Sequence, residues 1–447
     1  MVASARSRDL FGQPRGLSVL FLTQMWEIFS YYGMRSLLVY YMTKQLLLGQ
    51  QQASLVYGVY TATVYFTPII GGVISDRWLG RRRAVIIGAS IMAFGHFLMA
   101  SESLFYFALA AIALGNGLFL PSLPSQIDGL YAKDDPRRGS AYNVYYVGIN
   151  VGGLLAPLVC GTLGELYGWH YGFGAAGIGM VAGLLIYVLG ARHLPEEGLH
   201  PTRKDTAATP AVALQRHELW QRLRVLVAIA LTVMLFRGAY EQVGNTIALW
   251  ADTGINRTLA GSMLGGFVIP MTWFQSLNPL LVIVLTPLFV AHWTRQARHG
   301  REPAPARKMA MGAIGVACAY LMLAAVSAST PAGQASWIWL ALFFLVLTSG
   351  ELFILPIGLG LFARLAPAGH GATTIAAWFS ATFGGSLLAG LLGTYWSVLG
   401  PSSFFVLMGA VGIAAGVLLW LLDRPTRRVE AVAQLPAAAT IAAPTTP

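Results

Sequence analysis

The sequence has few charged residues for its length and only two cysteines. Charged side chains make up 11% of the 447 residues, whereas an ordinary soluble domain carries about 25%. Cys160 and Cys318 both lie within apolar runs, so neither a disulfide framework nor a metal cluster is indicated. The N-terminal region shows no small-residue cleavage site after a short apolar core, so no signal peptide is expected. These shortages argue against a soluble domain and against a disulfide scaffold.

Long apolar segments dominate the chain instead. Hydrophobic residues account for 56% of it, and the mean hydropathy is +0.62, which favours an all-α membrane protein with many spans. A spanning helix needs about 20 apolar residues. Twelve segments meet this length approximately: Leu17–Met42, Ala53–Ser75, Ala84–Ala100, Leu104–Leu130, Ala141–Leu163, Tyr171–Leu189, Val225–Trp250, Phe267–His292, Met309–Ser327, Ser336–Phe362, Thr373–Leu399 and Phe404–Leu422.

The positions of the basic residues predict the orientation of these spans. Of the 29 Lys and Arg residues, all but four fall in the tails or in the even-numbered connections. Lys44 and Arg257 lie in odd-numbered connections, and Arg35 and Arg237 lie within spans. Because positive residues concentrate on the cytoplasmic side, we expect both termini in the cytoplasm and the chain in the inner cell membrane. The basic excess therefore reflects topology, and no nucleic-acid partner is predicted.

A long polar interruption divides the chain into two parts. We expect a cytoplasmic tail over 1–16, a six-helix bundle over 17–190, a cytoplasmic linker over 191–222 and a second six-helix bundle over 223–422. Residues 423–447 are expected to form a disordered cytoplasmic tail. The linker is too short and too polar for a further pair of spans. Repeated halves of this kind are typical of transporters.

One face of the first span carries unusual polar residues. In the stretch QMWEIFSYYGMR, Gln24, Glu27, Ile28, Tyr31 and Arg35 recur at steps of three and four, so they share a helical face. A charged side chain at the centre of a spanning helix costs about 2.5–3.5 kcal/mol on insertion scales. Two charges on one face indicate that this face looks into a protein-lined or watery cavity.

The second connection contains a recognisable loop. GVISDRWLGRRR is similar to the cytoplasmic signature loop of the major facilitator superfamily, with Gly72, Asp76 and Arg77 at the signature positions. Asp76 ends a helix and can pair with an arginine or with a neighbouring helix terminus, which would stabilise one conformation. The alternative is a simple basic loop.

Several segments resemble one family of this superfamily, the proton-dependent oligopeptide transporters. EIFSYYG resembles their helix 1 signature, E-x-x-E-R-F-x-Y-Y-G. YYVGINVGGLLAPL resembles the helix 5 signature, with Asn150 at the substrate-facing position, and SGELFILPIGLG resembles the helix 10 motif, with Glu351 at the carboxylate position. YEQVGNTIALW, WFQSLNPL and AAWFSAT are further matches. The resemblance covers nearly the whole chain.

The sequence also departs from the family pattern. Gln24 replaces the first glutamate of helix 1, Ile28 its arginine, Leu120 the helix 4 lysine, and Leu355 a small polar residue of helix 10. Three deep carboxylates remain, from Glu27, Glu241 and Glu351, beside the arginines Arg35 and Arg237. The ionised set sums to minus one, and protonating one carboxylate would balance it. We therefore expect one of the three glutamates to carry a coupling proton.

The resemblance implies roles for the charged residues. Arg35 and Glu241 would form a salt bridge between helices 1 and 7 that closes the extracellular gate, although a static buried pair is the alternative. Glu351 would receive the amino terminus of a peptide, or remain a protonated structural residue. Arg237 either pairs with Glu241 one turn away or helps Arg35 hold the peptide carboxylate.

Further residues are expected around the binding pocket. Tyr31, Tyr32, Tyr65 and Asn150 would line it from the first half, and Trp273 and Trp378 from the second. Tryptophans in membrane helices also serve as packing residues or interface anchors. His96 is expected to be a packed neutral histidine, and the histidine spacings suggest no metal site.

Together these features predict a transporter of the major facilitator fold, with twelve transmembrane helices in two six-helix bundles. The expected function is proton-coupled import of di- and tripeptides by alternating access. A carrier or exporter of another small solute (an amino-acid conjugate, an anion or a drug) and a substrate-sensing receptor remain alternatives. Enzyme activity is not expected, because no nucleophile and base cluster together. The expected partners are small peptides and the lipid bilayer, with protons as the coupling ion, no other cofactor, and a monomeric protein.

Overall fold

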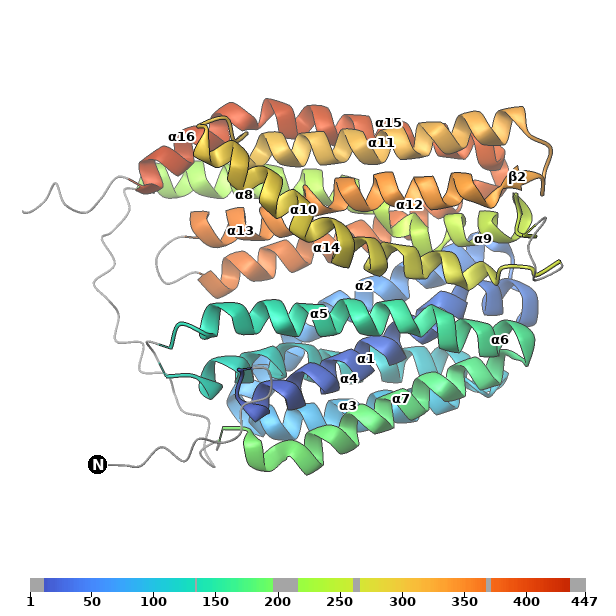
Figure 1. The fold of residues 1–447 in the computed structure, drawn as a ribbon, viewed down its shortest axis with the longest axis horizontal. Helices are drawn as coiled ribbons and strands as arrows, with labels where there is room; N and C mark the ends of the chain where they lie inside the picture. The colour runs from blue at the N-terminus through green and yellow to red at the C-terminus, as the bar shows by residue number, and fades with distance from the viewer. Residues whose placement is uncertain (1–11, 133–134, 196–215, 260–265, 367–370, 435–447) are drawn as a thin grey trace, which may run out of the picture.

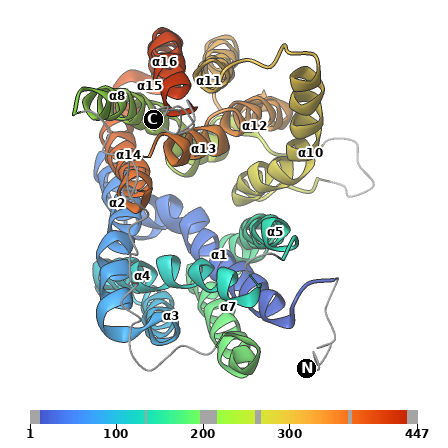
Figure 2. The ribbon, with the colours of Figure 1, turned by 90° about the vertical axis from the view of Figure 1, so that its left-hand side faces the viewer.

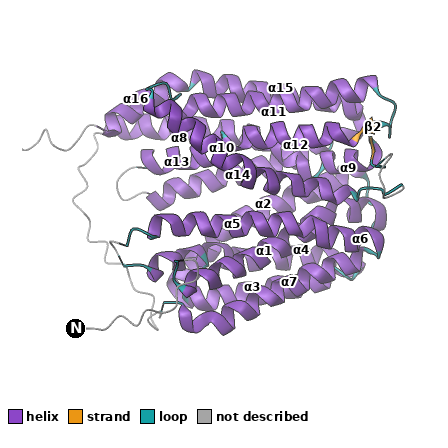
Figure 3. Ribbon diagram, in the orientation of Figure 1, coloured by secondary structure: helices purple, strands orange, loops and turns teal. Residues whose placement is uncertain are grey.

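The structure is a bundle of long helices with almost no other regular structure (Figure 1; Figure 3). It is a computed structural model that describes residues 12–132, 135–195, 216–259, 266–366 and 371–434. The helices of the first half are α1 Arg15–Tyr40, α2 Gln50–Ile74, α3 Arg81–Leu98, α4 Phe105–Ser122, α5 Arg138–Ala156, α6 Thr162–Leu166 and α7 Trp169–Gly190. The helices that follow are α8 Arg216–Tyr240, α9 Thr246–Thr253, α10 Leu277–Arg298, α11 Pro305–Ser329, α12 Trp337–Leu352, α13 Leu355–Leu365, α14 Gly371–Gly393, α15 Trp396–Leu421 and α16 Asp423–Gln434. Two short strands, β1 Ile255–Asn256 and β2 Ala335–Ser336, pair in parallel.

Each of the twelve predicted spans is helical over most of its length. Among the described residues, nine helices are long and apolar enough to cross a membrane, and 377–393 forms a shorter apolar helix. Helices α1 and α3 are outside this group, since α1 buries polar and charged residues and α3 begins with three arginines. The protein is therefore an all-helical membrane protein, and the count of twelve crossings stays a prediction.

Three spans are broken into two helical pieces. A π-helical turn, Pro157–Gly161, joins α5 to α6, and a 3-10 turn, Glu241–Gly244, joins α8 to α9. The third break separates α12 from α13, where Pro356 lies at the start of α13. Proline removes a backbone donor, and irregular backbone inside a membrane protein is tolerated where it lines a cavity or is covered by protein. The second and third breaks are the ones that position Glu241 and Glu351.

The helices form two groups that meet mainly along two pairs of helices. Within the first half, α1 packs on α5 and α7, and α4 packs on α2 and α3. Within the second half, α11 packs on α12 and α15, and α14 packs on α8. Between the halves, α2 lies beside α14 and α5 beside α10, as the end-on view shows (Figure 2). The exact limits of the two predicted units, 17–190 and 223–422, stay predictions.

A pair of glycines allows one helix of each half to approach the other closely. A Cβ atom added at Gly58 of α2 would lie 2.5 Å from the Cα of Gly390 of α14. Side chains at these positions would force the two helices apart, because packed interiors leave no room for extra methyl groups. The two glycines therefore keep α2 and α14 in direct backbone contact.

The C-terminal tail differs from the expectation of disorder over 423–447. Residues 423–434 form helix α16, and 435–447 lie outside the described residues. Asp423 begins the helix, where a negative charge is favourable, and its carboxylate pairs with Arg427 at 3.0 Å and with Arg307 of α11 at 3.3 Å. Val429 is buried against the second half. These local contacts stabilise a helix that composition alone did not indicate.

Of the predicted linker over 191–222, residues 196–215 also lie outside the described part, and α8 begins at Arg216.

Candidate functional site

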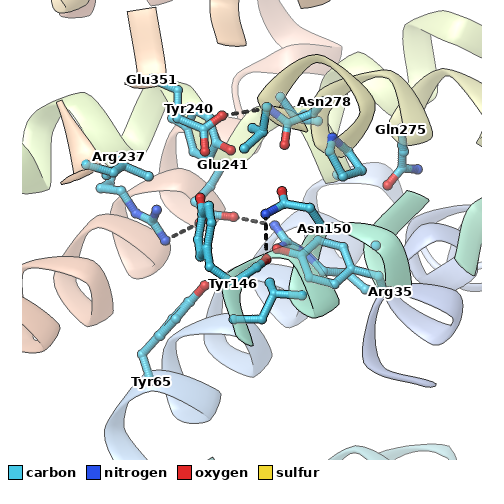
Figure 4. A pocket seen from close by; sticks show the side chains of 18 residues that line it. Arg35, Tyr65, Tyr146, Asn150, Arg237, Tyr240, Glu241, Gln275, Asn278 and Glu351 are labelled. Carbon is cyan, nitrogen blue, oxygen red and sulfur yellow. Dashed lines mark hydrogen bonds and ion pairs between the residues drawn. The ribbon is translucent and has the colours of Figure 1, made fainter. Parts of the chain in front are cut away.

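A cavity of about 230 Å³ lies between the two halves (Figure 4). Helices α1, α2 and α5 line it from the first half, and α8, α10, α12 and α13 line it from the second. Its polar and charged lining consists of Tyr32, Arg35, Tyr65, Tyr146, Asn150, Arg237, Tyr240, Glu241, Gln275, Asn278 and Glu351. A cavity in which polar groups from both halves converge on one small volume is a candidate small-molecule site.

The carboxylate of Glu241 joins two arginines beside this cavity. Arg35 Nη2 donates to Glu241 Oε2, and this contact joins the first half to the second. Arg237 Nη2 donates to Glu241 Oε1 at 2.6 Å, which is the i,i+4 pair given as one of the two alternatives for Arg237. The Glu241 side chain is only 1% exposed. One buried carboxylate therefore serves both arginines, and the trio carries a net charge of plus one when ionised.

Tyrosines hold the two arginines in place. Tyr57 accepts hydrogen bonds from Arg35 Nε at 2.9 Å and from Arg35 Nη2 at 2.6 Å. The guanidinium carbon of Arg237 lies 5.5 Å from the ring centre of Tyr65 and 5.4 Å from that of Tyr240. Cation–π contacts of this kind stabilise desolvated arginines by roughly 2 kcal/mol. The aromatic side chains thus fix the positive groups without neutralising them.

Glu351 is the other carboxylate of the cavity. Asn278 Nδ2 donates to Glu351 Oε2 at 2.6 Å and also lies 3.0 Å from Thr348 Oγ1. Asn278 and Tyr240, which both hydrogen-bond Glu351, are neutral, in contrast to the arginines around Glu241. With Arg35, Arg237, Glu241 and Glu351 all ionised, the charges of the cavity sum to zero.

Seven of the eleven residues predicted for substrate binding, proton coupling and gating line this cavity. Tyr32, Arg35, Tyr65, Asn150, Arg237, Glu241 and Glu351 are all part of its lining. The Asn150 amide donates to the Tyr146 carbonyl oxygen at 3.0 Å. Sequence reasoning gave no role to Tyr146, Tyr240, Gln275 and Asn278, although each lies inside or next to a segment that resembles a family motif.

Glu27 lies apart from the cavity lining. Its Oε2 accepts from Gln24 Nε2 at 2.7 Å, and the hydroxyl of Tyr145 donates to Gln24 Oε1. The expected sum of minus one counted Glu27 together with the cavity charges, and the structure separates it from them. Gln24 stands at the position of the first glutamate of the helix 1 signature, so this position supplies a neutral donor to Glu27.

Three predicted aromatic residues are also outside the lining. Tyr31 is buried, and its hydroxyl has no hydrogen-bond partner among the described residues. Trp273 donates from Nε1 to Thr162 Oγ1 at 2.7 Å, next to α6. Trp378 packs against Phe362, with ring centres 5.2 Å apart. These contacts agree with packing roles for both tryptophans.

The predicted signature loop runs from the end of α2 through the π-helical turn Ser75–Leu79 to the start of α3. Asp76 and Arg77 are exposed, Gly72 is half-buried, and the described part of the chain holds no ion pair of Asp76. Its role in stabilising a conformation stays a prediction.

His96 is fully buried, and neither ring nitrogen has a partner among the described residues. No group of three metal-binding side chains occurs within the described ranges.

Comparisons with known proteins agree on one family. A family model described as the POT family matches residues 82–209 and 206–400. A di-/tripeptide transporter of Lactococcus lactis subsp. cremoris is 31% identical, over 94% of this chain and 97% of its own. The peptide transporter YePEPT of Yersinia enterocolitica subsp. palearctica is 32% identical, over 94% of this chain and 96% of its own. A solved structure of a mutant peptide transporter POT in complex with alafosfalin has a TM-score of 0.85 at 28% identity, over 94% of this chain and 97% of that one.

The shared carboxylate predicts a specific pattern of stability changes. Glu241→Gln leaves two buried arginines without their counter-charge, and breaking a buried pair in this way costs roughly 3–5 kcal/mol. The double variant Glu241→Gln/Arg237→Gln restores the original net charge and should recover part of that loss. Thermal unfolding in detergent measures both effects, with the exposed Glu102→Gln as the matched control. Equal stability of all three variants would contradict the shared-carboxylate account.

Proposed function

The chain belongs to the POT family, and from this premise we propose that it is a proton-coupled symporter that imports di- and tripeptides by alternating access. It is an integral membrane protein with the major facilitator fold, and two of its relatives are named as peptide transporters. The observation that carries the proposal is the cavity between the halves, which presents two arginines and a separate carboxylate to one small volume.

The charges of this cavity suit a small zwitterion. The carboxylate of a peptide would bind Arg35 and Arg237, and its amino group would bind Glu351 beside Asn278. The bases that the family has at Ile28 and Leu120 are absent here, so Arg237 would supply the second positive charge at the carboxylate end. A zwitterion adds no net charge to a cavity whose own charges already balance.

The same geometry favours Glu351 as the carrier of the coupling proton. Among the described residues, a proton can neutralise Glu351 without breaking an ion pair, because its hydrogen bonds come from the neutral side chains of Asn278 and Tyr240. Protonating Glu241 would instead leave Arg35 and Arg237 without their shared counter-charge. A protonated Glu351 would still offer its carbonyl oxygen as an acceptor to the peptide amino group, so the cavity could hold proton and peptide together.

The remaining assignments complete this proposal. Both termini would face the cytoplasm, with the chain in the inner cell membrane and active as a monomer. No covalent step, metal or organic cofactor is needed, since transport uses only the proton gradient. The rival functions are transport of another small solute with the same fold and substrate sensing without transport.

Uptake into proteoliposomes tests the function and the proton carrier together. An inward pH gradient should drive accumulation of labelled dialanine, and a protonophore should abolish it. Unlabelled tripeptides should compete, whereas single amino acids and nitrate should not. Glu351→Gln should lose gradient-driven accumulation while keeping peptide exchange across the membrane, because the neutral amide still occupies the site.

Glu27→Gln is the matched comparison, since Glu27 lies outside the cavity lining. It should retain gradient-driven accumulation. Peptide uptake that ignores the gradient in the unmodified protein would refute symport. Normal gradient-driven accumulation by Glu351→Gln would show that another residue carries the coupling proton. Competition by amino acids or nitrate alone would favour transport of another small solute.

Arg237 provides a separate test of carboxylate binding. Arg237→Gln should raise the KM for dialanine about tenfold, because a hydrogen bond to a charged group contributes about 1.5–3 kcal/mol. The same substitution should leave the KM for dialanine amide unchanged, since that peptide lacks the carboxylate. Arg224→Gln, at an exposed position of the same helix, is the control. An equal increase for both peptides would show that Arg237 acts only by holding Glu241.

A further inference from the structure

The odd-numbered connections contain only two basic residues, and both take part in one network of ion pairs. Lys44 Nζ lies 2.7 Å from Asp252 Oδ2, and Arg257 Nη2 lies 3.5 Å from Asp252 Oδ1. Arg257 Nη1 continues the network to Glu165 Oε2 at 3.9 Å. These residues lie at the end of the molecule that holds α6, α9 and β2 (Figure 1). The two Lys and Arg residues of the odd-numbered connections therefore share one structural role.

Glu165 of α6 contacts the second half through three further hydrogen bonds. The backbone N–H groups of Met271 and Thr272 donate to its carboxylate at 2.9 Å and 2.8 Å, and the Thr272 hydroxyl donates at 2.5 Å. These donors open the 3-10 turn Met271–Ser276 that leads into α10. The first N–H groups of a helix have no partner within it, so a carboxylate is a favourable acceptor there. The Glu165 side chain is only 8% exposed.

The surrounding surfaces approach closely at the same place. A Cβ atom at Gly161 would overlap the side chain of Thr272, so only glycine allows this contact. Trp273 Nε1 donates to Thr162 Oγ1 at 2.7 Å, and Ser276 Oγ donates to the Leu154 carbonyl oxygen at 2.8 Å. The start of α10 is therefore held against the end of the α5–α6 span by several bonds.

The network joins the two halves at this end in two places. Lys44 and Glu165 belong to the first half, whereas Asp252, Arg257 and the Met271–Ser276 turn belong to the second. Both links are separate from the Arg35–Glu241 pair beside the cavity. An alternating-access cycle requires the halves to separate at each end in turn. Opening the cavity at this end would therefore break the bonds of Glu165 and the Lys44–Asp252 pair.

We infer that Glu165 is a positioning residue that keeps the outer end of the transport cavity closed. Its carboxylate holds the start of α10 against α6, Arg257 supports that carboxylate, and Lys44 with Asp252 secures the same closure. The outer position follows from the predicted topology, which places odd-numbered connections outside the cell. The inference relies on the proposed alternating access, but its test needs no transported solute.

Loss of these bonds should shift the conformational balance measurably. A single hydrogen bond to a charged group changes an equilibrium by roughly tenfold or more. Glu165→Ala removes the acceptor of three such bonds and of an ion pair, so it should populate a form that is open at this end. Glu165→Gln keeps an amide oxygen as acceptor and should give an intermediate shift.

Spin-label distances across the outer end test the inference. Tyr171→Cys at the start of α7 and Ile338→Cys at the start of α12 place labels on the two halves at positions that are 54% and 58% exposed. Cys318 is exposed and is replaced by Ala, whereas Cys160 is buried and stays. In lipid nanodiscs, Glu165→Ala should add a longer-distance population that the unmodified protein lacks.

Glu102→Gln is the matched control, because Glu102 lies at the same end and bonds only Gln45 of its own half among the described residues. Its distance distribution should stay unchanged. If Glu165→Ala does not fold, Thr272→Val removes one of the three donors at nearly constant shape and should shift the distribution in the same direction. A lower melting temperature with an unchanged distance distribution would overturn the inference. Failure to transport peptides would refute the proposed function while leaving this measurement valid.

Discussion

The carboxylate of Glu241 is the contact on which the charge arrangement of this protein depends. It lies where α8 gives way to a 3-10 turn, and it bonds Arg35 from the first half and Arg237 from its own helix. Without it, two buried cations would face each other beside the cavity. Arg35, Arg237 and Glu241 together carry one excess positive charge, which the carboxylate of Glu351 can neutralise. A peptide with both termini charged can then bind the arginines and Glu351 without changing the net charge of the cavity. The same carboxylate thus links the halves and sets the chemistry of the site.

Much of this arrangement could be predicted from the sequence. Long apolar segments located the helices, because spanning length and burial leave few alternatives to helix in a membrane. Charged residues inside those segments pointed to the cavity, and Arg35, Arg237, Glu241 and Glu351 all lie there. The i,i+4 spacing made the Arg237–Glu241 pair one of two alternatives for Arg237, and the structure contains this pair at 2.6 Å.

Other features depend on geometry that sequence patterns do not carry. Because Glu27 and Arg35 share a helical face, the sequence pattern grouped Glu27 with the cavity charges. In the structure Glu27 is hydrogen-bonded to Gln24 and lies outside the cavity lining. Asn278 directly follows the 3-10 turn Met271–Ser276. Helical spacing in the sequence does not predict which way a side chain points after such a turn, so the contact of Asn278 with Glu351 was not predicted. The sequence did not predict a role for Glu165, because two of its hydrogen-bond donors are backbone N–H groups of a segment that is distant in the sequence. Helix α16 was missed because its composition is polar, and its contacts with α11 come only from the folded arrangement.

The central claim is that peptide and proton cross together through the cavity around Glu241 and Glu351. The most direct measurement is the internal pH of weakly buffered proteoliposomes when dialanine is added outside without an imposed gradient. Symport predicts internal acidification that depends on the peptide, and its loss in Glu351→Gln. Entry of dialanine with no change in internal pH would contradict the account.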